Sequence, residues 1–178
     1  PIVISQYPRT VNISSGQVVG VFGTRAPQCV TALVTRLVVE VGPADLQLIF
    51  VGDAGDDWKF FKQFAHVRMT PLDRFDLDSS DIENKHRLLL ISQKDFVAQR
   101  TSIARRMLQR ENVSMIVVAE EHNELPAICT NTVSADDCGI DGMSLTTTLE
   151  FAHALEQWVD PDNESALIPR RVNFSKIF

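Results

Sequence analysis

The sequence has few cysteines, no long apolar run and no excess of basic residues, and each of these absences excludes a class of protein. Three cysteines do not make the disulfide framework of a small secreted protein, so we expect Cys29, Cys129 and Cys138 to be reduced thiols. Cys129 and Cys138 flank a predicted turn, so a disulfide between them is the alternative. No apolar run approaches the ~20 residues that a membrane helix needs, and no signal-peptide pattern opens the chain.

The charge balance argues against a general affinity for nucleic acid. Aspartate and glutamate outnumber lysine and arginine by 23 to 17, which gives a net charge of -6. A nucleic-acid-binding protein usually presents a basic face. The densest basic cluster consists of Arg100, Arg105, Arg106 and Arg110, and we interpret it as a solvated helix face; a nucleic-acid site on these arginines is the alternative.

Length and hydrophobicity predict one domain. The chain has 178 residues, 44% of them hydrophobic, which suffices for one substantial core. The sequence begins at Pro1 rather than at methionine, so we expect residues 1–178 to be a single module of a longer, multidomain protein.

Short apolar runs alternate along the chain with stretches of helical spacing. The runs lack polar alternation, which is typical of buried parallel strands. We expect strands at 18–22, 46–51, 88–91, 114–119 and 128–134, with shorter ones at 144–148 and 172–174. Helices are expected from Pro27 to the Gly42-Pro43 pair and at 58–64, 95–110 and 150–159, and surface segments at 69–85 and 136–142. Because parallel neighbours need helical crossovers, this order predicts an α/β fold with a mainly parallel sheet and helices on both faces.

The first strand leads into a helix through a segment that fits the frame of a phosphate-binding loop. Residues 20–27 align with the pattern G-x-x-x-x-G-K-[ST], so that Gly20 takes the first glycine, Arg25 the second, Ala26 the lysine and Pro27 the Ser/Thr. Arg25 adds a side chain where the backbone must curl around phosphates. Ala26 cannot neutralise a phosphoryl group, and Pro27 has no hydroxyl for Mg²⁺ and no N–H. The sequence therefore predicts a loop that lacks the groups for nucleotide hydrolysis.

Acidic residues that would hold Mg²⁺ and position water are also missing at the expected place. Ser92 and Gln93 follow the strand at 88–91, and Asp95 is interpreted as a cap of the next helix. The pair Glu120 and Glu121 follows the next strand and is the alternative candidate for residual chemistry; a solvated loop is the other interpretation. The four histidines show no metal-ligand spacing.

Several segments, in this order, resemble the FtsK/SpoIIIE-type ATPases of actinobacterial and Gram-positive type VII (ESX, EccC/EssC-like) secretion systems, and in particular their degenerate ATPase-like domain. The resemblance lies in residues 20–25, similar to a G-x-x-G-x-R replacement of the Walker A loop, in 56–58 with 64–67, in 117–121 with 125–126 and 129–130, and in 168–172. It implies a three-layer P-loop NTPase-like (RecA-like) domain, with Gly20, Gly23, Thr24 and Arg25 as the degenerate phosphate loop.

The resemblance also implies a role without catalysis. The module would bind no cofactor or metal and would contact neighbouring FtsK/SpoIIIE ATPase domains of the same chain in a hexameric translocase. It would be a cytoplasmic domain of a parent associated with the inner membrane, whose substrate is a secreted protein or DNA. The alternative is a divergent NTPase domain that binds ATP and Mg²⁺ and uses Glu120 or Glu121.

Overall fold

The fold was obtained as a computed structural model, which describes residues 11–52, 58–71, 85–98, 106, 108, 110–136 and 145–156. The expectations for Arg100, Arg105 and Cys138, and for residues 72–84, 137–142 and 172–174, lie outside the described residues. Among the described residues, Cys29 is buried and Cys129 is half-buried, and no disulfide joins them.

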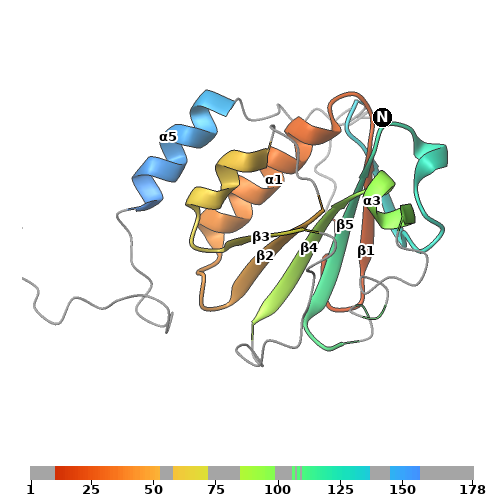
Figure 1. Cartoon of the computed structure of the whole chain (residues 1–178), viewed down its shortest axis with the longest axis horizontal. Helices are drawn as coiled ribbons and strands as arrows, with labels where there is room; N and C mark the ends of the chain where they lie inside the picture. Colours follow the sequence, from red (N-terminus) through yellow and green to blue (C-terminus); the bar gives the residue numbers. More distant parts are fainter. Residues whose placement is uncertain are drawn as a thin grey trace, which may run out of the picture.

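Six strands form one parallel sheet in the described part of the chain (Figure 1). Their spatial order is β3-β2-β4-β5-β1-β6. The bounds are β1 Val18–Phe22, β2 Leu46–Val51, β3 Val67–Thr70, β4 His86–Ser92, β5 Val113–Ala119 and β6 Asn131–Ser134. All pairings are parallel, so the carboxyl ends of the strands meet along a single edge. The α/β class with a parallel sheet is confirmed.

Helices cover both faces of the sheet, so the fold has three layers. On one face lie α1 (Ala26–Glu40) and the 3-10 helix η1 (Lys59–Gln63), and α5 (Leu145–Glu156) packs against both of them. On the other face lies α3 (Gln93–Ala98), as Figure 1 shows. A hydrophobic core fills each interface: the first contains Val30, Val34 and Phe61, and the second contains Phe96. The strands β1, β2, β4 and β5 contribute alternate residues to the two cores, because successive side chains of a strand point to opposite faces.

The first helix follows its sequence signals closely. Pro27 lies in the first turn, where its missing N–H is harmless, and no side chain caps the N-terminus. Val30, Val34 and Val38 are buried at helical spacing. The helix ends at Glu40 with Val41 in extended conformation, two residues before Pro43. The position of α1 against the first core thus brings its N-terminus to the carboxyl end of β1.

Two expected elements are wrong. Residues 69–70 belong to β3, a short edge strand that pairs with β2, and not to a surface segment. Residues 145–148 form the first turn of α5 and not an edge strand. Within α5, the large apolar side chain of Phe151 is 41% exposed. The strand expected at 128–134 is shorter than predicted, since β6 begins at Asn131.

Within the described part of the chain, none of the helices combines the length and the apolar character that a membrane span requires.

Candidate functional site

The turn between β1 and α1 is short and closed on itself. Gly23, Thr24 and Arg25 are the whole connection between the last residue of β1 and the first of α1. Gly23 has φ 117°, a conformation that side-chain-bearing residues rarely adopt. Its N–H donates to the Glu120 carbonyl oxygen at 3.1 Å, and its own carbonyl accepts the N–H of Ala26 at 3.0 Å. The turn is therefore tied to the end of β5.

The carboxylate of Asp136 occupies the mouth of this turn. It accepts the Thr24 N–H at 2.9 Å, the Thr24 hydroxyl at 2.8 Å and the Arg25 N–H at 3.1 Å. These bonds, led by that of the Thr24 hydroxyl, hold the pKa of Asp136 below its ordinary value. Asp136 reaches the turn because β6 runs parallel to β1, and the Ala135 N–H donates to the Phe22 carbonyl at 2.8 Å.

The backbone N–H groups of residues 23–26 all donate hydrogen bonds within the chain. Gly23 donates to Glu120, Thr24 and Arg25 donate to Asp136, and Ala26 donates to Gly23. Position 27 is proline and has no N–H. A phosphate-binding loop holds its ligand with backbone N–H groups that point at the phosphates. In this turn those groups already have internal acceptors.

Gly23 is required by the same arrangement. A methyl group at Gly23 would run into the Asp136 carboxylate, whose Cγ would lie 2.8 Å from it. The absence of a side chain at Gly23 therefore makes room for an internal carboxylate.

The remaining positions of the predicted loop are not gathered at the turn. Gly20 lies inside β1, where its missing Cβ makes room for Leu125; a Cβ there would be 2.6 Å from a Leu125 methyl carbon. Ala26, at the lysine position of the pattern, is fully buried in the first core. The structure thus brings Gly23, Thr24 and Arg25 together and places Gly20 apart from them.

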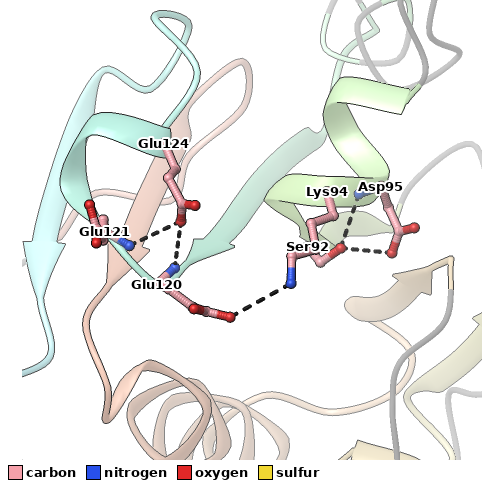
Figure 2. A network of polar contacts seen from close by, with 6 residues as sticks. All are labelled: Ser92, Lys94, Asp95, Glu120, Glu121 and Glu124. Atoms are coloured by element: carbon pink, nitrogen blue, oxygen red, sulfur yellow. Dashed lines mark hydrogen bonds and ion pairs between the residues drawn. The ribbon is translucent and has the colours of Figure 1, made fainter.

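The acidic pair after β5 takes part in a local backbone cap (Figure 2). Glu124 accepts the N–H groups of Glu120 and Glu121 through one carboxylate oxygen, each at 3.1 Å. The Glu121 side chain in turn accepts the Glu124 N–H, which completes a capping box on the 3-10 helix η3 (His122–Glu124). The Glu120 side chain extends toward Lys94 and lies 3.7 Å from its ammonium group, with both side chains more than 80% exposed.

Asp95 serves the start of α3 in a similar way. Ser92 is the residue before the helix, its hydroxyl accepts the Asp95 N–H at 3.1 Å, and it donates to the Asp95 carboxylate at 2.7 Å. The interpretation of Asp95 as the cap of this helix is wrong: the helix begins at Gln93, Ser92 holds the cap position, and Asp95 lies in the first turn. Gly52, with φ 94°, leaves space for the Asp95 carboxylate.

Two further groups with reactive side chains are constrained by packing or burial. The His122 ring meets the Phe22 ring edge to face, with centroids 4.9 Å apart. Burial raises the pKa of the Cys129 thiol to about 11, so that it is not a nucleophile at neutral pH. Within the described ranges, no group of three or more His, Cys, Asp or Glu side chains is placed to hold a metal ion.

Asp136 is the residue that sequence reasoning missed. We placed it in a turn, because nothing near it in the sequence indicates a partner 112 residues away. The only local signal is its place directly after a strand, at the edge where the other strands also end.

Comparison with known proteins finds solved structures with a similar fold but no matching sequence family. No family model matches the sequence, and no curated protein matches it. Among solved structures, the cytoplasmic domain of EssC is similar with a TM-score of 0.48 and 10% identity, over 67% of this chain and 32% of that chain. EssC (ATPases 2 and 3) from Geobacillus thermodenitrificans is similar with a TM-score of 0.47 and 10% identity, over 66% and 32%. The chain thus spans about a third of the length of these structures.

Proposed function

We propose that this chain is a non-catalytic, P-loop-like module of an FtsK/SpoIIIE-type translocase of the type VII secretion kind. The observation that carries the proposal is the closed turn after β1, in which an internal carboxylate and two backbone carbonyls take up the N–H groups that would hold a phosphate. The order of sequence motifs that resembles the degenerate domain of that family supports the assignment.

Three physical obstacles oppose ATP at this turn. A triphosphate must displace the Asp136 carboxylate, which is itself anionic and repels the incoming charge. No lysine is present at position 26, and a lysine there would be buried in the first core, which is costly for an unpaired ammonium group. Pro27 supplies neither an N–H nor a hydroxyl for Mg²⁺.

The module then acts through contacts rather than chemistry. In this proposal it is a cytoplasmic domain that packs against neighbouring FtsK/SpoIIIE ATPase domains of a longer chain, within a hexameric parent associated with the inner membrane. The parent moves a secreted protein or DNA, and this module supports assembly or regulates the adjacent ATPases.

The contacts of Glu120 and Glu121 favour structural roles over catalysis. Glu121 belongs to the capping box of η3, and Glu120 lies in an exposed ion pair with Lys94. Among the described residues, these contacts are structural, and they give the divergent-NTPase alternative no support.

Calorimetric titration with ATP and Mg²⁺, together with a phosphate-release assay, tests the proposal. We expect neither heat of binding nor turnover for the wild type, and the same for Glu121→Gln. Asp136→Ala frees two N–H groups but supplies no lysine, so it is expected to remain inactive in hydrolysis; Glu150→Ala, an exposed substitution on α5, is the matched control. Micromolar binding of ATP with turnover that Glu121→Gln abolishes would overturn the proposal.

A further inference from the structure

We propose that residues 11–15 form a strap across the amino edge of the sheet, which is closed over a neutral His86 and opens when the ring takes up a proton. The strap is the described stretch of chain ahead of Gly16, and it meets the amino ends of β4 and β5. This edge lies at the opposite end of the strands from the β1–α1 turn, so the inference is independent of the function proposed above.

Hydrogen bonds fix the end of the strap that leads into β1. The Gly16 N–H donates to the Val113 carbonyl at 2.7 Å, and the Asn112 N–H donates to the Ser15 hydroxyl oxygen at 3.0 Å. Val113 is the first residue of β5, so the first of these contacts belongs to the sheet. Together they set the boundary at which a movement of the strap stops.

Ile13 is the residue through which the rest of the strap lies on the sheet. Its half-buried side chain packs against the first core, and its backbone forms a hydrogen bond with the His86 ring. The Ser14 N–H donates to the Asn12 side-chain oxygen at 2.9 Å, a bond within the strap that moves with it. Val11, Asn12 and Ser14 are exposed. The contact of this part of the strap with the sheet therefore centres on Ile13.

His86 is half-buried under the strap, on the face of the sheet that carries α1. It is two positions ahead of Leu88, a residue of the first core, so both side chains point to that face. Its Nε2 lies 2.7 Å from the hydroxyl oxygen of Ser114, which is fully buried. Burial lowers the pKa of His86 below its ordinary value of 6.5, and the hydrogen bond to the Ile13 backbone opposes this shift without cancelling it.

Protonation of His86 therefore favours the open strap. A ring that binds its proton weakly when it is covered binds it more tightly once water reaches it, so acid shifts the equilibrium toward opening. Above pH 6.5 the ring is neutral and the strap is closed. As the pH falls below 6.5 toward the lower pKa of the closed form, the closed form loses stability relative to the open one. The Ser114 hydroxyl adds to this effect, because it donates to Nε2 only while that nitrogen carries no proton.

The charged groups around His86 do not account for its lowered pKa. From the β2 side, Asp45 presents its backbone carbonyl, which accepts the His86 N–H at 2.8 Å. Arg87 projects to the other face, that of the second core, and His66, the other imidazole at this edge, bonds to the backbone carbonyl that follows α1. Among the described residues, no charged side chain contributes to the shift, and the strap carries none. The further charged residues at the adjacent strand and helix ends are Glu40, Lys85, Arg110 and Glu111.

Backbone 15N relaxation, measured from about pH 7.5 down to about pH 5, where histidine is the side chain that ordinarily changes charge, tests the inference. The order parameters of Ile13 and Ser14 should fall from about 0.85, typical of rigid backbone, to below about 0.6, while Val19 in β1 stays rigid. His86→Gln retains an N–H donor for Ile13 but has no titratable group, so its strap should stay rigid throughout. The matched control His122→Gln, an exposed histidine at the opposite edge, should behave as the wild type does.

The pH at which the His86 ring titrates gives a second readout. Ile13→Ala shortens the half-buried side chain beside the ring but keeps the backbone carbonyl, so the pKa of His86 should rise toward 6.5. Val11→Ala, at an exposed position of the same strap, is the matched control and should leave that pKa unchanged. Order parameters of Ile13 that do not change with pH, the same loosening in His86→Gln, or a His86 pKa that Ile13→Ala does not move would overturn the inference.

Discussion

Replacing Gly23 by alanine places a methyl group where the Asp136 carboxylate now lies. Two costs follow from the structure. The backbone at Gly23 has φ 117°, and holding a residue with a side chain in such a region costs about 1–3 kcal/mol. The added carbon would also approach the Asp136 Cγ to 2.8 Å, which forces the carboxylate off Thr24 and Arg25.

The backbone cost alone predicts a measurable effect. With about 2 kcal/mol for the strain, Tm should fall by roughly 4–8 °C for a protein of this length. Urea denaturation gives the corresponding free energy of unfolding, and a midpoint that shifts with an unchanged slope indicates a change in stability alone.

A double-mutant cycle with Asp136→Ala isolates the steric contact. When the carboxylate is absent, the methyl group at position 23 meets no obstacle and only the backbone cost remains. The loss of stability caused by Gly23→Ala should therefore be smaller in the Asp136→Ala background than in the wild type. Equal losses in the two backgrounds would refute the packing of Asp136 on Gly23, and no loss in either would refute the strained turn.

Four further substitutions and conditions test other parts of the account. Gly20→Ala should cost about 1–3 kcal/mol in urea unfolding, because its Cβ crowds Leu125, and Leu125→Ala should remove that cost. Phe61→Ala, at a fully buried position of the first core, should cost about 3–5 kcal/mol by the same measurement. Burial lowers the pKa of His86 in the folded chain from its ordinary value of 6.5, so the unfolded chain binds the proton more tightly. The free energy of unfolding should therefore fall as the pH drops below 6.5, and this decrease should be absent in a pH series on His86→Gln. Glu120→Gln removes an exposed ion pair and should change stability by less than about 0.5 kcal/mol; a larger change would mean that the pair is not solvent-screened.

The strands of the centre of the sheet were predictable because each is apolar on both faces. The apolar runs that predicted β1, β2, β4 and β5 match their positions to within two residues. β3 was missed because it lies at the edge, is only four residues long and carries the exposed Arg68, so its conformation depends on pairing with β2.

The first turn of α5 shows the opposite error. Thr146, Thr147 and Thr148 are β-branched and favour a strand by local propensity, yet they begin a helix that packs against α1 and η1. Tertiary packing therefore overrode the local preference for a strand.

The position of the β1–α1 turn was predictable, but its contact with Asp136 was not. The apolar strand and Pro27 located the β1–α1 turn, and the altered residues at 25–27 predicted a loop without the chemistry of hydrolysis. The closure by Asp136 depends on the pairing of β6 with β1, a long-range register that no local pattern encodes. Gly20 was expected both within the strand at 18–22 and as the first glycine of the loop pattern, and its packing under Leu125 could not be predicted from the sequence.

Nuclear magnetic resonance of the backbone amides in the turn tests the central claim most directly. The signals of Gly23, Thr24 and Arg25 are followed while ATP and Mg²⁺ are added to millimolar concentration. Because the N–H groups of these residues already donate within the chain, their chemical shifts should stay unchanged. A saturable shift of these three signals would contradict the account, since it would mean that phosphate displaces Asp136.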